Sequence, residues 1–388
     1  MKTELYIHIP FCVKKCNYCD FLSFSSNEND RSRYVDAVLR QIEEESSNLC
    51  LSGNVPEISS IYMGGGTPSV LGAEEISRIM SKVFTCFNVD SDSENTIEVN
   101  PGTIELCKLK ELKNAGFNRI SIGMQSTKNE TLRMLGRIHT YDEFYQNYVN
   151  SREAGFDNIN IDVMMGLPEQ SLDEVMSTVS DVISLNPEHI SAYSLIIEEG
   201  TPFYKQYGNI EGPVVGEELE RKMYWETVDL LASAGYSHYE ISNFAKPTFE
   251  SRHNSGYWKR TPYIGIGLGA SSLMRQVEMD TGEKSECRIR NLTNFEDYIR
   301  NPLGKDSVTE LSIEEQMDEF MFLGLRMSRG VDLDEFRKIY KTDAFVRYEK
   351  SLMKLVKEEL IKIDNSFVKL TRKGVDYGNY VFSQFFLE

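Results

Sequence analysis

Three cysteines near the start of the chain have the spacing of an iron–sulfur site. Cys12, Cys16 and Cys19 follow a short apolar segment, residues 5–9, which predicts a strand. Thiolates this close together on one loop can hold the irons of a [4Fe–4S] cluster, which normally takes four of them. Three thiolates would leave one iron free to chelate a small molecule.

A structural zinc site is the alternative interpretation of these thiols. Zinc takes four ligands, commonly two Cys pairs or a Cys pair with histidines. No second pair is present, because the other four cysteines are scattered and are expected to be structural: Cys50, Cys86, Cys107 and Cys287. The spacing therefore favours a cluster, with Cys12, Cys16 and Cys19 as its ligands.

A glycine-rich segment, Gly64-Gly65-Gly66-Thr67-Pro68, ends the next expected strand, residues 61–63. Glycines allow the backbone to approach a ligand closely and to adopt a positive φ. Alone, the segment could be a simple turn. One strand after the cysteine loop, it predicts a second ligand contact.

Polar residues also occur at the ends of later strands, at Glu98, Gln125 and Asp162. Such side chains among apolar strand residues are costly to bury without a partner. They could bind a ligand's hydroxyl or ammonium groups, or they could make buried hydrogen bonds or helix caps. The residues alone leave both interpretations open.

The elements that would position these residues alternate between strand and helix up to about residue 200. Further strands are expected at 96–99, 119–123, 159–164 and 190–195, and amphipathic helices include 31–45 and 74–87. Alternation of this kind predicts an α/β protein with a parallel sheet and chemistry at the carboxyl ends of the strands. Six units are too few for an eight-stranded barrel, so a partial barrel is expected.

The remainder divides into two further parts. A helix is expected over 217–234, followed by a loop-rich stretch. Three helices near 312–328, 332–341 and 346–360, a hairpin over 360–370 and a final helix outline a winged-helix-like domain. The predicted division is 1–235 for the core, 236–305 for a loop-rich extension and 306–388 for the C-terminal helical domain.

Together these motifs resemble the radical S-adenosylmethionine (SAM) proteins, and among them the oxygen-independent coproporphyrinogen III oxidase group. The resemblance is strongest to the haem chaperone branch of that group. It covers nearly the whole chain and rests on segments 6–12, 64–68, 135–139, 160–168 and 239–245. It implies a partial (β/α)6 barrel with a C-terminal helical domain, and SAM contacts at Tyr6, Gly65, Gly66, Thr67, Glu98, Gln125, Arg137 and Asp162.

Two departures separate this chain from the oxidases of that group. The oxidases carry a further Cys two residues after the third, where this sequence has Phe21. They also have an extension before the cluster loop, whereas this sequence reaches Cys12 almost at once. Both departures argue against decarboxylation of coproporphyrinogen III.

The segment His253-Asn-Ser-Gly-Tyr-Trp258 matches the motif that the chaperone branch uses for haem. Imidazole is a common axial ligand of haem iron, and the two aromatic rings could stack on a porphyrin. The resemblance thus implies haem ligation by His253. Weaker candidates are His8, His139, His189 and His238.

We therefore expect a haem chaperone that carries a SAM-binding [4Fe–4S] cluster and passes haem to apo-haemoproteins. Catalysis stays open, with the coproporphyrinogen oxidase, a related radical SAM haem methyltransferase and a purely structural cluster protein as rivals. The net charge of −18 argues against a nucleic-acid partner. With no apolar run of bilayer length and no secretory signal, a cytoplasmic location is expected. The sequence leaves homodimerisation open.

Overall fold

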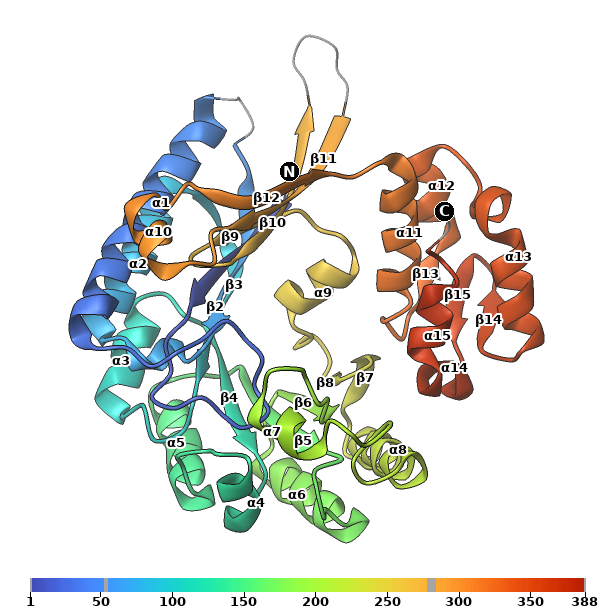
Figure 1. Ribbon diagram of the computed structural model, residues 1–388, viewed down its shortest axis with the longest axis horizontal. Helices are drawn as coiled ribbons and strands as arrows, with labels where there is room; N and C mark the ends of the chain where they lie inside the picture. Colours follow the sequence, from blue (N-terminus) through green and yellow to red (C-terminus); the bar gives the residue numbers. More distant parts are fainter. Residues whose placement is uncertain (1, 52–54, 278–283, 387–388) are drawn as a thin grey trace.

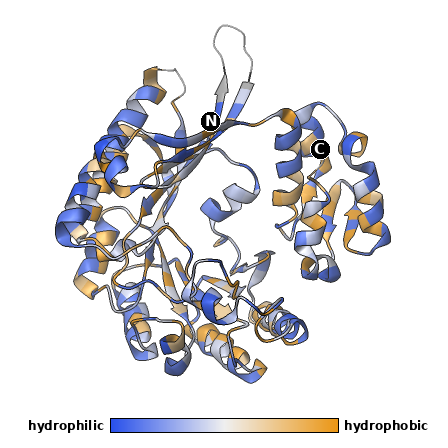
Figure 2. Cartoon of the chain, viewed as in Figure 1, coloured by the Kyte–Doolittle hydropathy of each residue, from blue (hydrophilic) through white to orange (hydrophobic). Residues whose placement is uncertain are grey.

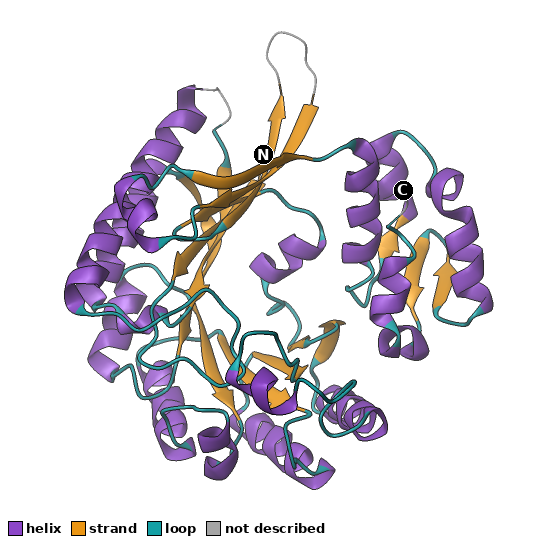
Figure 3. Ribbon diagram, in the orientation of Figure 1, coloured by secondary structure: helices purple, strands orange, loops and turns teal. Residues whose placement is uncertain are grey.

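The computed structural model describes residues 2–51, 55–277 and 284–386 of the chain. Its centre is a mixed twelve-stranded sheet in the order β12-β11-β10-β9-β1-β2-β3-β4-β5-β6-β8-β7 (Figures 1 and 3). This sheet runs from one edge strand to another without closing. The predicted open α/β barrel is thus confirmed.

The first six strands are the ones that the sequence predicts, and neighbours among them pair in parallel. Each includes the expected segment or most of it, and several begin earlier than expected. Their bounds are β1 (Lys2–Ile9), β2 (Glu57–Gly65), β3 (Asn88–Val99), β4 (Arg119–Gln125), β5 (Ile159–Met165) and β6 (His189–Ser194).

Helices cover the outer face of these strands (Figure 1). The buried side of α1 carries Tyr34, Val35, Val38 and Ile42, the positions that the helical period predicts. Figure 2 shows both hydrophilic and hydrophobic colours along these helices, as two-faced helices require. They are α1 (Glu28–Leu51), α2 (Ala73–Cys86), α3 (Leu106–Asn114), α4 (Asn129–Met134), α5 (Tyr141–Glu153), α6 (Leu172–Leu185) and α8 (Glu217–Ser233), with the short α7 (Pro202–Tyr207) near the carboxyl ends of the strands.

The expectation of a loop-rich stretch after residue 235 was wrong. Six short strands lie there and extend the sheet at both ends: β7 (Ser237–Glu240), β8 (Asn243–Ala245), β9 (Tyr263–Ile266), β10 (Ser271–Val277), β11 (Lys284–Asn291) and β12 (Lys305–Glu310). Two helices interrupt them, α9 (Arg252–Trp258) and α10 (Phe295–Arg300). β9 pairs with β1, so its partner lies more than 250 residues away in sequence and no local pattern marks the pairing.

The C-terminal part has its own core, and the predicted three helices and hairpin are confirmed. They are α11 (Ile313–Gly324), α12 (Leu333–Tyr340), α13 (Ala344–Lys357), β14 (Ile361–Asp364) and β15 (Phe367–Leu370). β13 (Val331–Asp332) adds a third strand, and the final helix is divided into α14 (Arg372–Asp376) and α15 (Gly378–Ser383). The exact boundaries of the three-part division stay a prediction.

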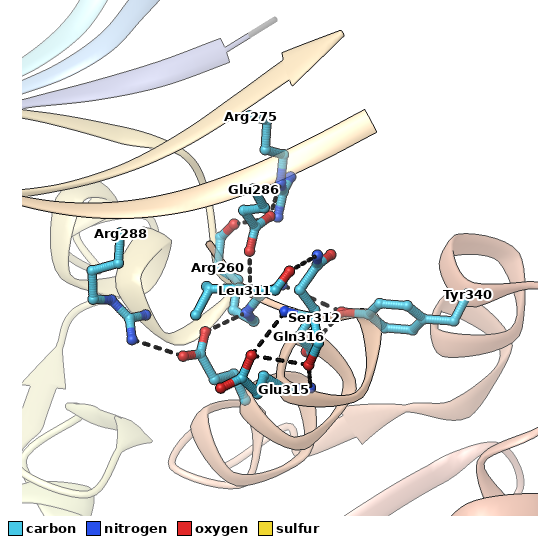
Figure 4. A network of polar contacts seen from close by, with 10 residues as sticks. Arg260, Arg275, Glu286, Arg288, Leu311, Ser312, Glu315, Gln316 and Tyr340 are labelled. Atoms are coloured by element: carbon cyan, nitrogen blue, oxygen red, sulfur yellow. Dashed lines mark hydrogen bonds and ion pairs between the residues drawn. The ribbon is translucent and has the colours of Figure 1, made fainter. Parts of the chain in front are cut away.

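Ion pairs join the C-terminal part to the sheet (Figure 4). The guanidinium of Arg260 is buried and contacts both Glu286 of β11 and Glu319 of α11, the latter at 3.0 Å. Arg326, just after α11, places its guanidinium 4.4 Å from the ring centroid of Trp258 on α9. The C-terminal part therefore packs against the end of α9. Within the described residues, no helix is both long and apolar enough to cross a bilayer.

Candidate functional site

A cavity of about 490 Å³ lies at the carboxyl ends of the parallel strands. All three clustered cysteines line it, and so do seven of the eight residues expected to contact SAM: Gly65, Gly66, Thr67, Glu98, Gln125, Arg137 and Asp162. These residues come from the loop after β1 and from regions at or following the ends of β2, β3, β4 and β5. The structure thus brings together residues up to 150 positions apart, although their ligand contacts remain predictions.

Two of the three cysteine thiols receive polar contacts from neighbouring side chains. The Thr67 hydroxyl points to Cys12 Sγ at 3.5 Å, and Arg137 Nη1 points to Cys16 Sγ at 3.6 Å. In the described part of the chain, no three His, Cys, Asp or Glu side chains are grouped so that they could hold one metal ion. A cubane distributes its cysteines over different irons, so a cluster does not require three of these side chains to converge on one metal position.

The glycine segment packs directly on the cysteine loop. The Gly66 and Thr67 amides donate to the carbonyls of Ile9 and Phe11 at 2.8 and 2.7 Å. A Cβ on Gly66 would lie 2.7 Å from the Phe11 carbonyl oxygen. Gly65 has a φ of +108°, which side chains rarely adopt. These glycines therefore set the position of the cysteine loop, whatever ligand they also contact.

Glu98 is an acid of the cavity whose carboxylate has two protein hydrogen-bond partners. Its carboxylate accepts hydrogen bonds from the Tyr62 hydroxyl at 2.7 Å and the Gly65 amide at 3.0 Å. Burial raises the pKa of Glu98 to about 7, against the opposing effect of the Tyr62 hydrogen bond. A ligand ammonium or hydroxyl would favour its ionised form, so Glu98 suits the amino acid or ribose part of SAM.

The other expected SAM contacts are held by neighbouring strands. Asp162 accepts from Asn160 Nδ2 at 2.7 Å, and burial raises its pKa. Gln125 ends β4 with a φ of +71° and accepts from a tyrosine hydroxyl on β6. Arg137 Nη2 donates to Asn100 Oδ1 at 2.6 Å and to the Gly123 carbonyl at 2.5 Å.

Tyr6 is the exception among the expected SAM contacts. It is absent from the described lining of the cavity, and its hydroxyl instead pairs with His8 Nδ1 at 3.0 Å. Conversely, sequence reasoning missed several residues that do line the cavity: Tyr62, Asn100, Arg119, Ser121, Asn160, Ser191 and Tyr193. The sequence signal that could have found some of them is the two-residue period of a strand. This period places Ser121 on the same face of β4 as Arg119.

His253 lies at the amino end of α9, with 1% of its surface exposed. Its Nδ1 pairs with Ser60 Oγ at 2.9 Å and its Nε2 with the Tyr257 hydroxyl at 3.1 Å. The ring stacks on Tyr62, with centroids 5.1 Å apart. Burial, aided by the charge of Arg119, lowers the pKa of His253 to about 3, so the imidazole is neutral. Neutral imidazole is the form that binds iron, but both nitrogens have protein partners in this conformation.

The other histidines also have protein partners. His8 Nε2 contacts the Leu22 carbonyl, and His139 Nε2 contacts the Met124 carbonyl. His189 lies between Asn160 and Tyr239, and His238 pairs with Tyr224 and the Ile241 carbonyl. These contacts give each of the four a structural explanation.

Comparison with known proteins agrees with this geometry. Residues 6–182 match the radical SAM superfamily, and residues 311–377 match the HemN C-terminal domain. The cavity and sheet are therefore those of a radical SAM protein.

Relatives over the full length narrow the assignment. The chain is 34% identical to "Heme chaperone HemW" of Lactococcus lactis, covering 99% of this chain and 97% of that one. It is 36% identical to the protein of the same name in Bacillus subtilis, covering 98% of both. The chain belongs to the HemW family. Its fold also matches a solved structure of coproporphyrinogen III oxidase (HemN) from Escherichia coli, with a TM-score of 0.82, 24% identity, and coverage of 99% of this chain and 89% of that one.

Proposed function

We propose that this protein is a haem chaperone that binds haem and delivers it to apo-haemoproteins in the cytoplasm. Its relatives over nearly the whole chain are named haem chaperones. The observation that carries the proposal is the placement of the His253 motif. Helix α9 lies against the SAM cavity, because Asn254 and Tyr62 line that cavity while Tyr62 stacks on His253.

We further propose that Cys12, Cys16 and Cys19 hold a [4Fe–4S] cluster, with SAM on its open iron. Such a cluster would supply an electron to bound SAM. Glu98, Gln125 and Asp162 would orient SAM through their hydrogen bonds, and Arg137 would stay beside the cluster through its contact with Cys16. Tyr6 would affect SAM binding only indirectly, since its hydroxyl contacts His8 and does not line the cavity.

Haem ligation by His253 requires a local opening in this proposal. Haem iron must replace either Ser60 or Tyr257 as the partner of a ring nitrogen. Helix α9 has only seven residues, and its Trp258 is covered by Arg326 from the C-terminal part. Loss of that cover would free the motif, which gives the C-terminal part a role as a lid on the haem site.

The test is a haem titration of the anaerobically reconstituted protein, followed at the Soret band. Wild type is expected to bind about one haem per chain, and His253→Ala to show a weakened, shifted spectrum. His238→Ala is the control, because His238 is partly buried with protein partners and lies outside the motif. Absence of specific haem binding by wild type would overturn the proposal.

The oxidase activity is the rival that the same sample can test. Phe21 stands where the oxidases carry a further cysteine, and its side chain is 59% exposed at the cavity. We expect no protoporphyrinogen from coproporphyrinogen III, SAM and reductant under anaerobic conditions. Formation of that product would replace the chaperone proposal with an enzymatic one.

A further inference from the structure

Arg119 is a fully buried cation at the inner part of the cavity. It begins β4 with 1% of its surface exposed and is among the residues that line the cavity. Its register partner on β3 is Thr96, whose partner on β2 is Tyr62. Arg119 therefore lies two strand spacings, roughly 10 Å, from the residue that stacks on His253.

The guanidinium has no counter-ion in the described part of the chain. Among the described residues, Arg119 makes no ion pair with a carboxylate, and its Nε is buried without a hydrogen-bond partner. Its one side-chain hydrogen bond there joins Nη1 to Thr96 Oγ1 at 3.5 Å, which is long for such a bond. Arginine stays charged when buried, and an uncompensated buried charge is strongly destabilising.

The nearby acids form hydrogen bonds with residues other than Arg119. Arg119 favours ionisation of both Glu98 and Asp162, but burial outweighs this and raises the pKa of each. The Glu98 carboxylate accepts from Tyr62 and Gly65, while Asp162 accepts from Asn160. The other titratable groups that sense Arg119 are Tyr62, His189, Tyr239 and His253, none of which is an anion when buried. The site has a fixed positive charge and no fixed partner for it.

We infer that Arg119 is a carboxylate-binding subsite, and that its ligand is a propionate of the haem that the chaperone carries. This inference rests on the proposed function and adds to it the group that recognises the haem periphery. Haem carries two carboxylates on one edge, and a guanidinium can bind a carboxylate through two parallel hydrogen bonds. Both residues lie near Tyr62: His253 stacks on its ring, and Arg119 is two strands away from it.

The experiment compares haem with haem dimethyl ester, which keeps the iron and ring but lacks both carboxylates. Wild type is expected to bind haem about 10- to 100-fold more tightly than the ester. Arg119→Met should lose most of that preference through weaker haem binding, with ester binding unchanged. Arg119→Lys should recover part of it, because the charge remains but the paired hydrogen bonds do not. Lys350→Met is the matched control, since Lys350 is an exposed cation on α13 and does not line the cavity.

The outcomes separate the two proposals. Equal affinity of wild type for haem and ester overturns the subsite but leaves the chaperone in place. An equal loss of both ligands in Arg119→Met, with cluster content and thermal unfolding as controls, makes Arg119 structural and also overturns it. If Arg119→Met does not fold, the wild-type preference and the Arg119→Lys titration still decide the question. Binding of neither tetrapyrrole by wild type overturns the proposed function and the subsite together.

Discussion

The cluster side and the His253 side of the barrel differ in how far each is prepared for its ligand. On the cluster side, three thiols and seven expected SAM contacts already line one open cavity. On the His253 side, the imidazole is buried and both its nitrogens have partners. Under the proposed function, the first site would need only its ligands, whereas the second would also have to rearrange. Opening a closed conformation costs free energy, so a ligand that needs the open conformation binds with a lower apparent affinity.

The largest expected effect is loss of the cluster, with the His253 side left intact. Cys16→Ala removes one of three thiolates, so we expect loss of most of the cluster's iron and visible absorbance after anaerobic reconstitution. Iron analysis and absorbance spectra measure this. Cys107→Ala is the control, because Cys107 is exposed and lies outside the cavity. Full iron content in Cys16→Ala would remove the basis of the cluster assignment.

A second change tests how tightly the His253 side is closed. Glu4 lies beside His253, with its Oε2 3.9 Å from His253 Nδ1, and this oxygen has no hydrogen-bond partner. Burial, then the charge of Glu94, raises the pKa of Glu4 from 4.5 to about 9. Because the folded-state pKa is raised, this group's contribution to stability is full below pH 4.5 and is lost as the pH rises towards 9. Raising the pH from 6 to 8 should therefore increase the stability of Glu4→Gln relative to wild type by about 2.7 kcal/mol.

Urea unfolding of the two proteins at both pH values measures that difference. Glu57→Gln, at the start of the neighbouring strand β2, is measured in parallel as the control. A difference between Glu4→Gln and wild type that stays constant with pH would show that water already reaches Glu4.

A smaller effect is expected where the two sides meet. Tyr62 donates to Glu98 and stacks on His253. Tyr62→Phe keeps the ring but removes the hydroxyl, so we expect a loss of about 1 kcal/mol in the free energy of unfolding. The Soret position of bound haem should not change. Tyr145→Phe, at an exposed position, serves as control in the same denaturation experiment. A shifted Soret band would mean that Glu98 and His253 are coupled through the hydroxyl.

The smallest expected effect concerns the mouth of the cavity. Phe21→Cys restores the cysteine that the oxidases carry, but the cavity behind it is unchanged. We expect no production of protoporphyrinogen in an anaerobic assay with SAM and reductant. Measurable turnover would show that a single side chain separates the two activities.

The sequence predicted the cluster side better than the His253 side, and the reason is physical. Cys12, Gly65 and Glu98 follow consecutive parallel strands, whose carboxyl ends must meet at one edge of the sheet. Local patterns were therefore enough to place them together. Arg119 was missed because it begins a strand rather than ending one, where sequence reasoning does not expect chemistry.

The burial of His253 depends on contacts that no local pattern reveals. Its partners are Ser60, nearly 200 residues earlier, and Tyr257, one helical turn later. The cover over α9 comes from Arg326, in a different part of the chain. The motif thus indicated that the segment could ligate iron, but it did not indicate that His253 would be buried. The short strands after residue 235 were missed for the same reason, since their pairing partners are distant.

The pairing of β9 with β1 also bears on how the protein is made in the cell. β1 leaves the ribosome before β9 does, and one of its edges stays without its native neighbour until residues 263–266 follow. At roughly 5–20 residues per second, that delay is on the order of 10 to 50 seconds. An apolar strand with an open edge can pair wrongly during this time. During this interval, a molecular chaperone bound to the open edge of β1 would give the chain the most protection.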